Sequence, residues 1–173
     1  MVEIKTLIGE EELHKRIKEM GKQIEKEYAG KEITLICILK GSVFFTVELA
    51  KNITGDVKLE FIRVSSYGEG TESSGEIKMK LDLKDSIQGK DVIVIEDIID
   101  TGRTLSYLIE YLKMKKPNSV KLCALLDKPE RRVKKEVKVD YTGFQIPDKF
   151  VVGFGLDWDE KYRNLPYIGY IEN

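Results

Sequence analysis

The feature that most constrains the fold is a set of three predominantly apolar runs. They cover residues 33–39, 92–95 and 120–126. A short continuous apolar run is typical of a strand buried on both faces of a parallel sheet, because helices cover both of its faces. Stretches of helical periodicity separate the runs. This alternation predicts an α/β fold in which a mainly parallel, twisted sheet is flanked by helices.

Helical periodicity is clearest in residues 10–28, where apolar side chains recur every three or four positions and Gly30 supplies a stop signal. Two further helices are predicted, one over residues 43–53 and one that starts near Leu105 and ends at Pro117. Shorter strand-like patterns occupy residues 57–64, 77–83, 141–145, 151–154 and 167–171.

The 173 residues contain no internal repeat or linker, so we expect a single domain over residues 1–173. Residues 65–80 are rich in Gly, Ser, Thr and Glu and hold few apolar side chains, which predicts a mobile flap. The N-terminal segment and the strand-rich C-terminal third are expected to form a small hood on one edge of the sheet.

Charge and hydropathy argue against nucleic acid and membranes as partners. The 29 basic residues nearly balance the 30 acidic ones, so no bulk positive field exists to collect nucleic acid. No apolar stretch approaches the ~20 residues of a membrane span. One basic run is present at Lys128, Arg131, Arg132, Lys134 and Lys135, and its composition favours a solvated turn.

The cysteines and the histidine carry no recognisable catalytic or metal-binding pattern. Cys37 and Cys123 each lie inside an apolar run, so we expect both to be buried thiols. Unpaired thiols, together with an N-terminus that lacks an apolar signal core, favour a cytoplasmic location. His14 is the single histidine and lies in a polar helical stretch, so a catalytic triad is not expected.

The chemistry is concentrated where the second apolar run ends. Glu96, Asp97 and Asp100 place three carboxylates there, and Thr101-Gly102-Arg103-Thr104 follows at the start of a helix. Crowded carboxylates need a cation or hydrogen-bond donors nearby. The N-terminus of a helix offers free N–H groups and a favourable dipole for an anion. The segment therefore suits a ligand that carries both sugar hydroxyls and a phosphate.

Two other sequences also fall at strand ends, namely Lys40-Gly41-Ser42 and Asp127-Lys128. Ligands of parallel sheets bind at the carboxyl ends of the strands, so we expect these segments to share one cleft with the acidic segment. The sequence has neither the Walker phosphate loop nor the glycine fingerprint of dinucleotide-binding folds. An alternative is that Asp100 and Thr101 only cap the helix while Glu96 and Asp97 are solvated.

The run from Val92 to Thr104 closely resembles the phosphoribosyl-pyrophosphate motif of the type I phosphoribosyltransferases. The resemblance covers nearly the whole chain. Its further anchors are residues 39–41, 66–67, 125–128 and 146–157, with Arg163. Residues 147–157 resemble the 6-oxopurine branch of the family. The resemblance implies a Mg²⁺-dependent enzyme that moves the 5-phosphoribosyl group of phosphoribosyl pyrophosphate to hypoxanthine or guanine.

The resemblance also implies a role for each motif position. Glu96 and Asp97 would hold the ribose hydroxyls, directly or through magnesium-bound water, and Asp100 would be the general base near purine N7. The 5′-phosphate would lie against Ile99 and the cradle formed by Thr101, Gly102, Arg103 and Thr104. Arg103 stands where some relatives have lysine; it keeps the positive charge, but the two side chains differ in geometry.

The remaining implied roles concern pyrophosphate and the base. Lys40, Gly41, Ser66, Tyr67 and Arg163 would bind pyrophosphate, with a cis peptide expected before Lys40 and with the flap closing over the reaction. Lys128 would donate to purine O6, Phe150 would stack on the base, Val151 would meet its edge, and Asp157 would help hold a second magnesium. Without the resemblance, Phe150 reads as a core aromatic and Lys128 as an ordinary turn lysine.

Three other functions remain open from the sequence. The chain could be a phosphoribosyltransferase for xanthine or another purine, a nucleotide-sensing regulator that binds nucleic acid on the same fold, or an α/β domain without enzymatic activity. The retained acids favour catalysis. The resemblance implies a homodimer or a homotetramer.

Overall fold

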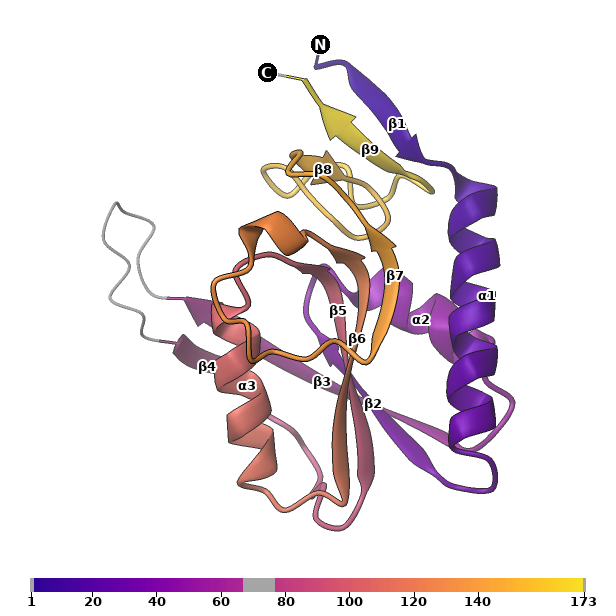
Figure 1. The fold of residues 1–173 in the computed structure, drawn as a ribbon, viewed down its shortest axis with the longest axis vertical. Helices are drawn as coiled ribbons and strands as arrows, with labels where there is room; N and C mark the ends of the chain where they lie inside the picture. Colours follow the sequence, from indigo (N-terminus) through magenta and orange to yellow (C-terminus); the bar gives the residue numbers. More distant parts are fainter. Residues whose placement is uncertain (1, 67–76, 173) are drawn as a thin grey trace.

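The computed structural model describes residues 2–66 and 77–172. The elements, in chain order, are β1 (Ile4–Ile8), α1 (Glu10–Glu27), β2 (Ile33–Ile38), α2 (Val43–Lys51), β3 (Val57–Ser66), β4 (Ile77–Leu81), β5 (Asp91–Ile99), α3 (Arg103–Lys113), β6 (Ser119–Asp127), the short 3-10 helix η1 (Pro129–Arg131), β7 (Tyr141–Gln145), β8 (Val151–Val152) and β9 (Ile168–Ile171). Figure 1 shows these elements as a large central sheet with a smaller sheet beyond one end of its strands.

The central sheet has six strands in the order β4-β3-β2-β5-β6-β7. All neighbouring pairs from β3 to β7 are parallel, and β4 alone pairs antiparallel with β3 at the edge. The three apolar runs of the sequence form β2, β5 and β6, which lie side by side in the middle of the sheet. The predicted α/β class with a mainly parallel sheet is therefore confirmed.

Helices cover both faces of this sheet, which explains why its central strands are apolar on both sides. Ile93 and Ile95 of β5 pack in one core cluster with Leu13 and Ile17 of α1 and with Phe45 of α2. The alternate residues Val92 and Val94 pack in a second cluster with Leu105, Leu108 and Leu112 of α3. Side chains along a strand point to opposite faces, so one apolar run serves both clusters.

The second sheet has the order β1-β9-β8 and joins the two ends of the described chain, since Ile4 pairs with Ile171. Its strands β8 and β9 follow β7 in the chain, and the sheet lies beyond the carboxyl ends of the parallel strands (Figure 1). Gly155 brings this region against the loop after β2. It has a φ of +99°, and a Cβ added there would lie 2.1 Å from the carbonyl oxygen of Gly41. Only glycine fits so close an approach in that conformation.

The ends of several elements differ from the sequence prediction. β5 continues to Ile99 because its backbone pairs with β6 beyond the apolar run, with Ile99 opposite Asp127. The acidic residues Glu96 and Asp97 therefore lie within the strand rather than in a turn. α2 and α3 end earlier than predicted, at Lys51 and Lys113.

Other differences concern the smaller sheet and the predicted flap. The predicted strand over residues 151–154 is limited to Val151–Val152, and β1 was not predicted as a strand. Both depend on β9, a partner distant in sequence. Residues 65–66 and 77–80 of the predicted flap belong to β3 and β4, which pair with each other. Residues 67–76 lie outside the described residues.

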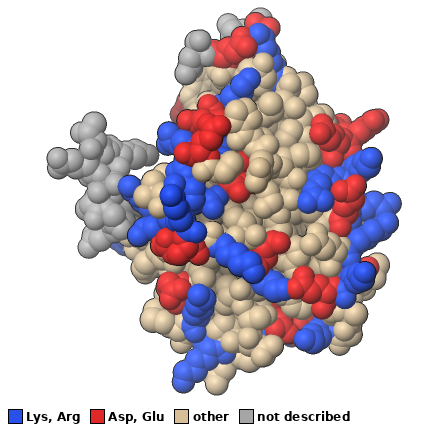
Figure 2. All heavy atoms as spheres, viewed as in Figure 1, with Lys and Arg blue, Asp and Glu red and all other residues tan. Residues whose placement is uncertain are grey.

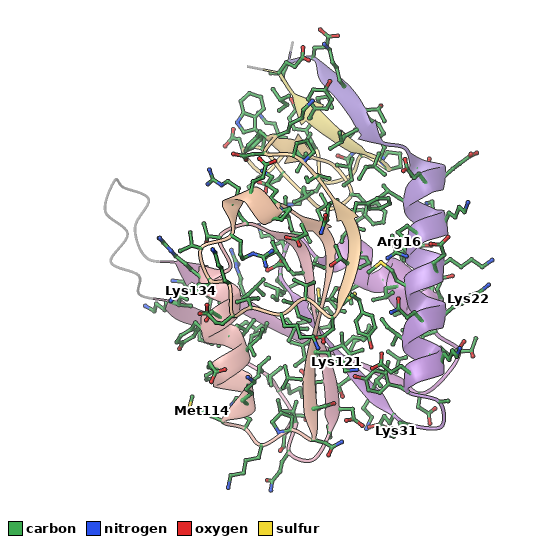
Figure 3. All side chains as sticks on the ribbon, in the orientation of Figure 1. Arg16, Lys22, Lys31, Met114, Lys121 and Lys134 are labelled. Carbon is green, nitrogen blue, oxygen red and sulfur yellow. The ribbon has the colours of Figure 1, made fainter. Side chains whose placement is uncertain are left out.

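Surface charges of both signs are interspersed over the face seen in Figure 2, in keeping with the near-zero net charge. Some basic side chains nevertheless connect elements. Arg16 points from α1 towards β7 (Figure 3) and donates hydrogen bonds to the carbonyl oxygens of Gly143 and Thr142, at 3.0 and 2.7 Å.

Cys37 and Cys123 are buried free thiols, as predicted. None of the described helices is long and apolar enough to cross a membrane.

Candidate active site

The carboxyl ends of β2, β5 and β6 lie at one edge of the sheet because the three strands are parallel neighbours. Lys40 and Gly41 follow β2, Glu96 and Asp97 lie near the end of β5, and Lys128 follows β6. The backbone N–H of Lys128 donates to the carbonyl oxygen of Ile99 at 2.9 Å, which ties two of these strand ends together. These segments therefore lie at one edge of the sheet, and the expectation that they share one cleft stays a prediction.

Glu96 and Asp97 are successive residues of β5 and are held by local donors. One carboxylate oxygen of Glu96 accepts from the buried hydroxyl of Ser42 at 3.2 Å and from the N–H of Asp97 at 3.0 Å. Asp97 accepts from the N–H of Ile98 at 2.6 Å. Enclosure by the protein, followed by the charge of Asp97, raises the pKa of Glu96 well above its ordinary value. Enclosure also raises the pKa of Asp97, against the opposing effect of Arg163.

Gly41 leaves the room that the Asp97 carboxylate occupies. A Cβ added at Gly41 would lie 1.7 Å from Oδ2 of Asp97. The peptide bond between Leu39 and Lys40 is cis, in agreement with the resemblance. The loop after β2 is therefore packed directly between the acidic pair of β5 and Gly155 of the C-terminal third.

The start of α3 and the acidic strand end face one cavity of about 240 Å³. Gly102, with a φ of +80°, is the N-cap of α3, and the first helical hydrogen bond runs from the N–H of Ser106 to the carbonyl oxygen of Gly102 at 2.9 Å. The N–H groups of the first turn therefore have no partner within the helix and can bind an anion. The cavity is lined by Ile38, Val64, Glu96, Ile98, Asp100, Thr101, Gly102, Arg103, Thr104 and Leu105.

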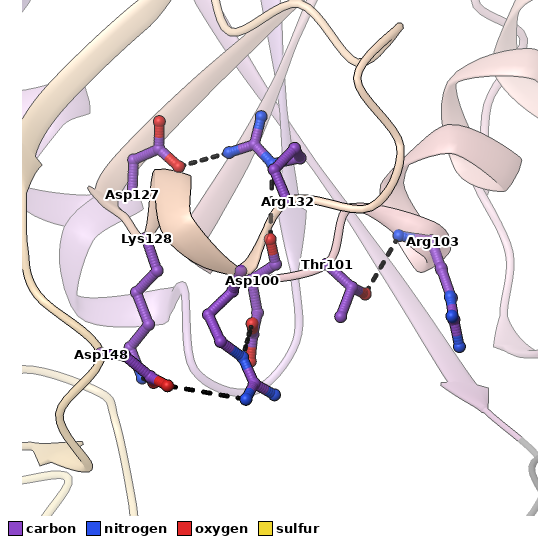
Figure 4. A network of polar contacts seen from close by, with 8 residues as sticks. Asp100, Thr101, Arg103, Asp127, Lys128, Arg132 and Asp148 are labelled. Carbon is purple, nitrogen blue, oxygen red and sulfur yellow. Dashed lines mark hydrogen bonds and ion pairs between the residues drawn. The ribbon is translucent and has the colours of Figure 1, made fainter.

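The turn after β6 is held by a network of charged side chains, shown in Figure 4. Nε of Arg131 donates to Oδ1 of Asp100 at 2.9 Å. Arg132 donates from Nη2 to Asp127 and from Nε to the carbonyl oxygen of Asp100, the latter at 3.4 Å. Lys128 is buried and its Nζ lies 3.4 Å from Oδ1 of Asp148, so it is not an ordinary solvated turn lysine. The expectation of a solvated turn is wrong for Lys128 and Arg132, whose side chains are largely covered, whereas Arg131 is exposed although it is paired.

Lys40 and Arg163, the two cations expected to bind pyrophosphate, both pair with the side chain of Glu160. Glu160 accepts from Nζ of Lys40 at 2.7 Å and, with its other oxygen, from Nη2 of Arg163 at 3.0 Å. These two cations, Lys40 first, lower the pKa of Glu160 below its ordinary value. Arg163 also lies 3.2 Å from Asp157 and donates to the carbonyl oxygen of Gly155 at 2.7 Å.

The base-binding candidates lie partly apart from this cavity. The Phe150 side chain is exposed, so the alternative of a core aromatic is wrong. It lines a separate cavity of about 560 Å³ with residues that include Trp158 and Lys5. Val151 lies in β8, the edge strand of the smaller sheet. Ser66 ends β3, and Tyr67 lies outside the described residues.

The acidic pair fits a hard divalent cation. Two partly exposed carboxylates lie beside each other, and the raised pKa of each shows that their negative charges are unfavourable without a positive partner. Within residues 2–66 and 77–172, no group of three or more His, Cys, Asp and Glu side chains is placed to hold a metal ion. Asp157 is paired with Arg163 and is not grouped with Glu96 and Asp97. Magnesium commonly takes only one or two protein carboxylates and completes its shell with water and substrate oxygens.

Several residues of this region were not singled out by the sequence. Ser42 and Asp148 lie in segments that the sequence singled out but were given no role, and Glu160 lies outside those segments, yet all three carry hydrogen bonds or ion pairs in the site. Arg131 and Arg132 were visible as part of a basic run, and their position just after a strand-end Asp-Lys pair was the signal that could have assigned them.

We predict that Gly41→Ala lowers the free energy of unfolding by about 1–3 kcal/mol, the usual cost of overpacking, because its Cβ would overlap the Asp97 carboxylate. Urea denaturation measures this change. Gly55→Ala is the matched control, since a Cβ there meets nothing within 4 Å. Equal urea midpoints for the two variants would contradict the prediction.

Comparison with known proteins agrees with this geometry. Residues 9–159 match the phosphoribosyl transferase domain. The chain is 52% identical over 168 residues to a hypoxanthine-guanine phosphoribosyltransferase of Streptococcus thermophilus, covering 97% of this chain and 93% of that protein. It is 49% identical to the protein of the same name in Bacillus subtilis, with the same coverage.

Solved structures give the same result. A hypoxanthine-guanine phosphoribosyltransferase of Bacillus anthracis superposes with a TM-score of 0.93 at 51% identity, covering 98% of this chain and 100% of that one. A hypoxanthine phosphoribosyltransferase of Staphylococcus aureus superposes with a TM-score of 0.93 at 47% identity, covering 97% and 91%. The fold, the acidic strand end and the matched domain together show that the chain belongs to the phosphoribosyltransferase family.

Proposed function

We propose that this protein is a purine salvage enzyme that transfers the 5-phosphoribosyl group of phosphoribosyl pyrophosphate to hypoxanthine or guanine. The products are IMP or GMP and pyrophosphate. One observation carries the proposal: the acidic strand end and the N-terminus of α3 line one cavity, as a ligand with a sugar diol and a phosphate requires. The names of the relatives support the choice of a 6-oxopurine as acceptor.

The phosphoribosyl group is assigned to the cavity at the end of β5. Thr101, Gly102, Arg103 and Thr104, next to Ile99, supply N–H groups, hydroxyls and a cation for the 5′-phosphate. Glu96 and Asp97 accept from the ribose hydroxyls or from water bound to Mg²⁺, and Asp157 is the further carboxylate proposed for a second magnesium. When bound, Mg²⁺ supplies positive charge that stabilises the pyrophosphate leaving group.

The base is assigned to the residues around Asp100 and the smaller sheet. Lys128 donates to O6, and Asp100 accepts the proton from N7. Phe150 offers an exposed ring for stacking. Val151 lies on the edge strand β8, whose outer side pairs with no other strand in the described part of the chain, so its backbone can meet the base edge.

The reaction follows from these positions. The bond between ribose C1 and the pyrophosphate oxygen breaks, and the electron pair leaves with pyrophosphate. Lys40, Arg163 and the N–H of Gly41 stabilise that charge, together with Ser66 at the end of β3 and with Tyr67, which is electrostatic catalysis by preorganised groups. N9 of the base forms the new bond to C1 while the proton on N7 passes to Asp100.

A steady-state assay with phosphoribosyl pyrophosphate and hypoxanthine, guanine, xanthine or adenine tests the function. We expect IMP and GMP to form only when Mg²⁺ is present. A preference for xanthine would mean that the proposed substrate must be revised. If no base gives a product and the protein binds RNA in a salt-dependent way, the protein is a nucleic-acid-binding regulator and not this enzyme.

We predict that Asp100→Asn lowers kcat by about 10²–10⁴-fold, the usual contribution of a positioned acid–base group, and leaves the Kd for IMP within a few-fold. Steady-state kinetics and calorimetry measure the two quantities. Asp85→Asn, which removes one exposed carboxylate far from this edge of the sheet, is the control. An unchanged kcat would remove Asp100 from the role of base.

We predict that Glu160→Gln tightens the binding of magnesium pyrophosphate by about 2- to 10-fold, because Glu160 pairs with both cations that the ligand needs. Calorimetry measures the Kd. Asp159→Asn removes the same charge from the neighbouring position, where the carboxylate lies 3.8 Å from Lys161. Weaker binding by Glu160→Gln would show that Glu160 holds the cations in place instead of competing for them.

We further propose that the protein is a cytoplasmic homodimer, or a homotetramer built from such dimers. Phe44 and Val47 of α2 and Leu59 and Phe61 of β3 are large apolar side chains that expose 41, 49, 43 and 41% of their surface, and we take them as the candidate interface. We predict that Phe61→Glu reduces the mass measured by light scattering to that of one chain. Lys58→Glu is the control, and an unreduced mass for Phe61→Glu would exclude this face as the interface.

A further inference from the structure

Four charged side chains form a chain of alternating sign between the two groups assigned to the base. Nζ of Lys128 lies 3.4 Å from Oδ1 of Asp148. Oδ2 of the same carboxylate lies 3.6 Å from Nη1 of Arg131. Nε of Arg131 then donates to Oδ1 of Asp100 at 2.9 Å. Each oxygen of Asp148 thus faces a different cation, and Arg131 faces a different carboxylate with each end of its guanidinium group.

We propose that Arg131 and Asp148 are positioning residues that fix the spacing between the amine assigned to purine O6 and the carboxylate assigned to purine N7. The inference rests on the proposed function. A 6-oxopurine presents an acceptor at O6 and, in its reacting form, a donor at N7, on the same edge. The protein must therefore offer one donor and one acceptor at a matching separation.

Neither end of this pair is rigid on its own. Lys128 has a flexible four-carbon side chain with three rotatable donors. Asp100 lies on the loop between β5 and α3, and its side chain is 46% exposed. Asp148 restricts the amine and Arg131 restricts the carboxylate. Because Arg131 occupies Oδ1 of Asp100, Oδ2 remains for the N7 proton.

The turn that carries Arg131 is itself anchored. Pro129 starts η1, and the N–H of Arg131 donates to the carbonyl oxygen of Lys128 at 3.0 Å. The next residue, Arg132, pairs with Asp127, and the side chains of this pair are only 13 and 9% exposed. A planar guanidinium group with its fixed fork of donors suits a bridge between two carboxylates better than an amine does.

Solvent exposure decides where the effect is measurable. The side chains of Arg131, Asp100 and Asp148 are 48, 46 and 46% exposed, so their ion pairs contribute little to the stability of the free protein. A bound purine covers Asp100 and Lys128 and excludes water, which strengthens the charges that face it. The variants should therefore fold normally and differ in how they bind the base.

The kinetic test compares Arg131→Ala and Asp148→Asn with the wild-type enzyme. We expect each to raise the KM for hypoxanthine by about 2- to 5-fold, the effect of one partly exposed ion pair, with the KM for phosphoribosyl pyrophosphate unchanged. Arg131→Lys keeps the charge and should recover part of the loss. Glu130→Gln, at an exposed position of the same turn, is the matched control and should behave as wild type.

Two further measurements separate a positioning role from a general structural one. Calorimetry should show weaker binding of IMP and unchanged binding of ribose 5-phosphate, which carries no base. The double variant Arg131→Ala/Asp148→Asn should be no worse than the poorer single variant, because both act in one chain of contacts.

The outcomes are distinguishable from failure of the proposed function. If the wild-type enzyme makes no nucleotide from any base, the function itself fails. If wild type is active and Arg131→Ala matches Glu130→Gln in every constant, the inference is overturned. Equal losses for IMP and ribose 5-phosphate, or fully additive single variants, would also overturn it.

Discussion

The structure depends on the crowding of two carboxylates at the end of a buried strand. Glu96 and Asp97 lie in the part of β5 that pairs with β6. This pairing fixes the backbone, so the two residues cannot move apart to reduce their repulsion. Their repulsion is offset by N–H groups, by the hydroxyl of Ser42 and by the charge of Arg163. A site held in this way is arranged for a cation or for hydroxyl donors before either arrives, which lowers the reorganisation that binding requires.

Close contacts at two glycines, Gly41 and Gly155, connect this acidic pair to other parts of the molecule. Asp97 fits only beside a residue without a side chain at position 41, and the carbonyl oxygen of Gly41 in turn fits only beside Gly155. Three segments from different parts of the chain, the end of β5, the loop after β2 and the region between β8 and β9, therefore meet with no room to spare. The smaller sheet is fixed relative to the central sheet at the candidate active site itself.

The cations assigned to pyrophosphate and to the base already have carboxylate partners. Lys40 and Arg163 share Glu160, and Lys128 pairs with Asp148. The ligand-free site is thus nearly neutral as a whole, although its substrates are strongly anionic. When a substrate binds, ion pairs within the protein are replaced by ion pairs with phosphate. The affinity therefore reflects the difference in free energy between these two sets of ion pairs and not the whole attraction between protein and phosphate.

Local patterns in the sequence determined the central sheet, the position of its helices and the motif from Val92 to Thr104, because burial on both faces and the start of a helix each leave a local signature. Only the tertiary structure decided the pairing of Ile4 with Ile171, the extension of β5 to Ile99, and the contacts of Arg131 and Glu160. The expected end of α3 at Pro117 was wrong because Lys116, with a φ of +56°, already lies in the turn beyond the helix. The physical reason is common to these cases. Strand pairing and ion pairs join residues that are distant in sequence, so no local pattern encodes them, whereas apolar periodicity is written into each segment by the face that it buries.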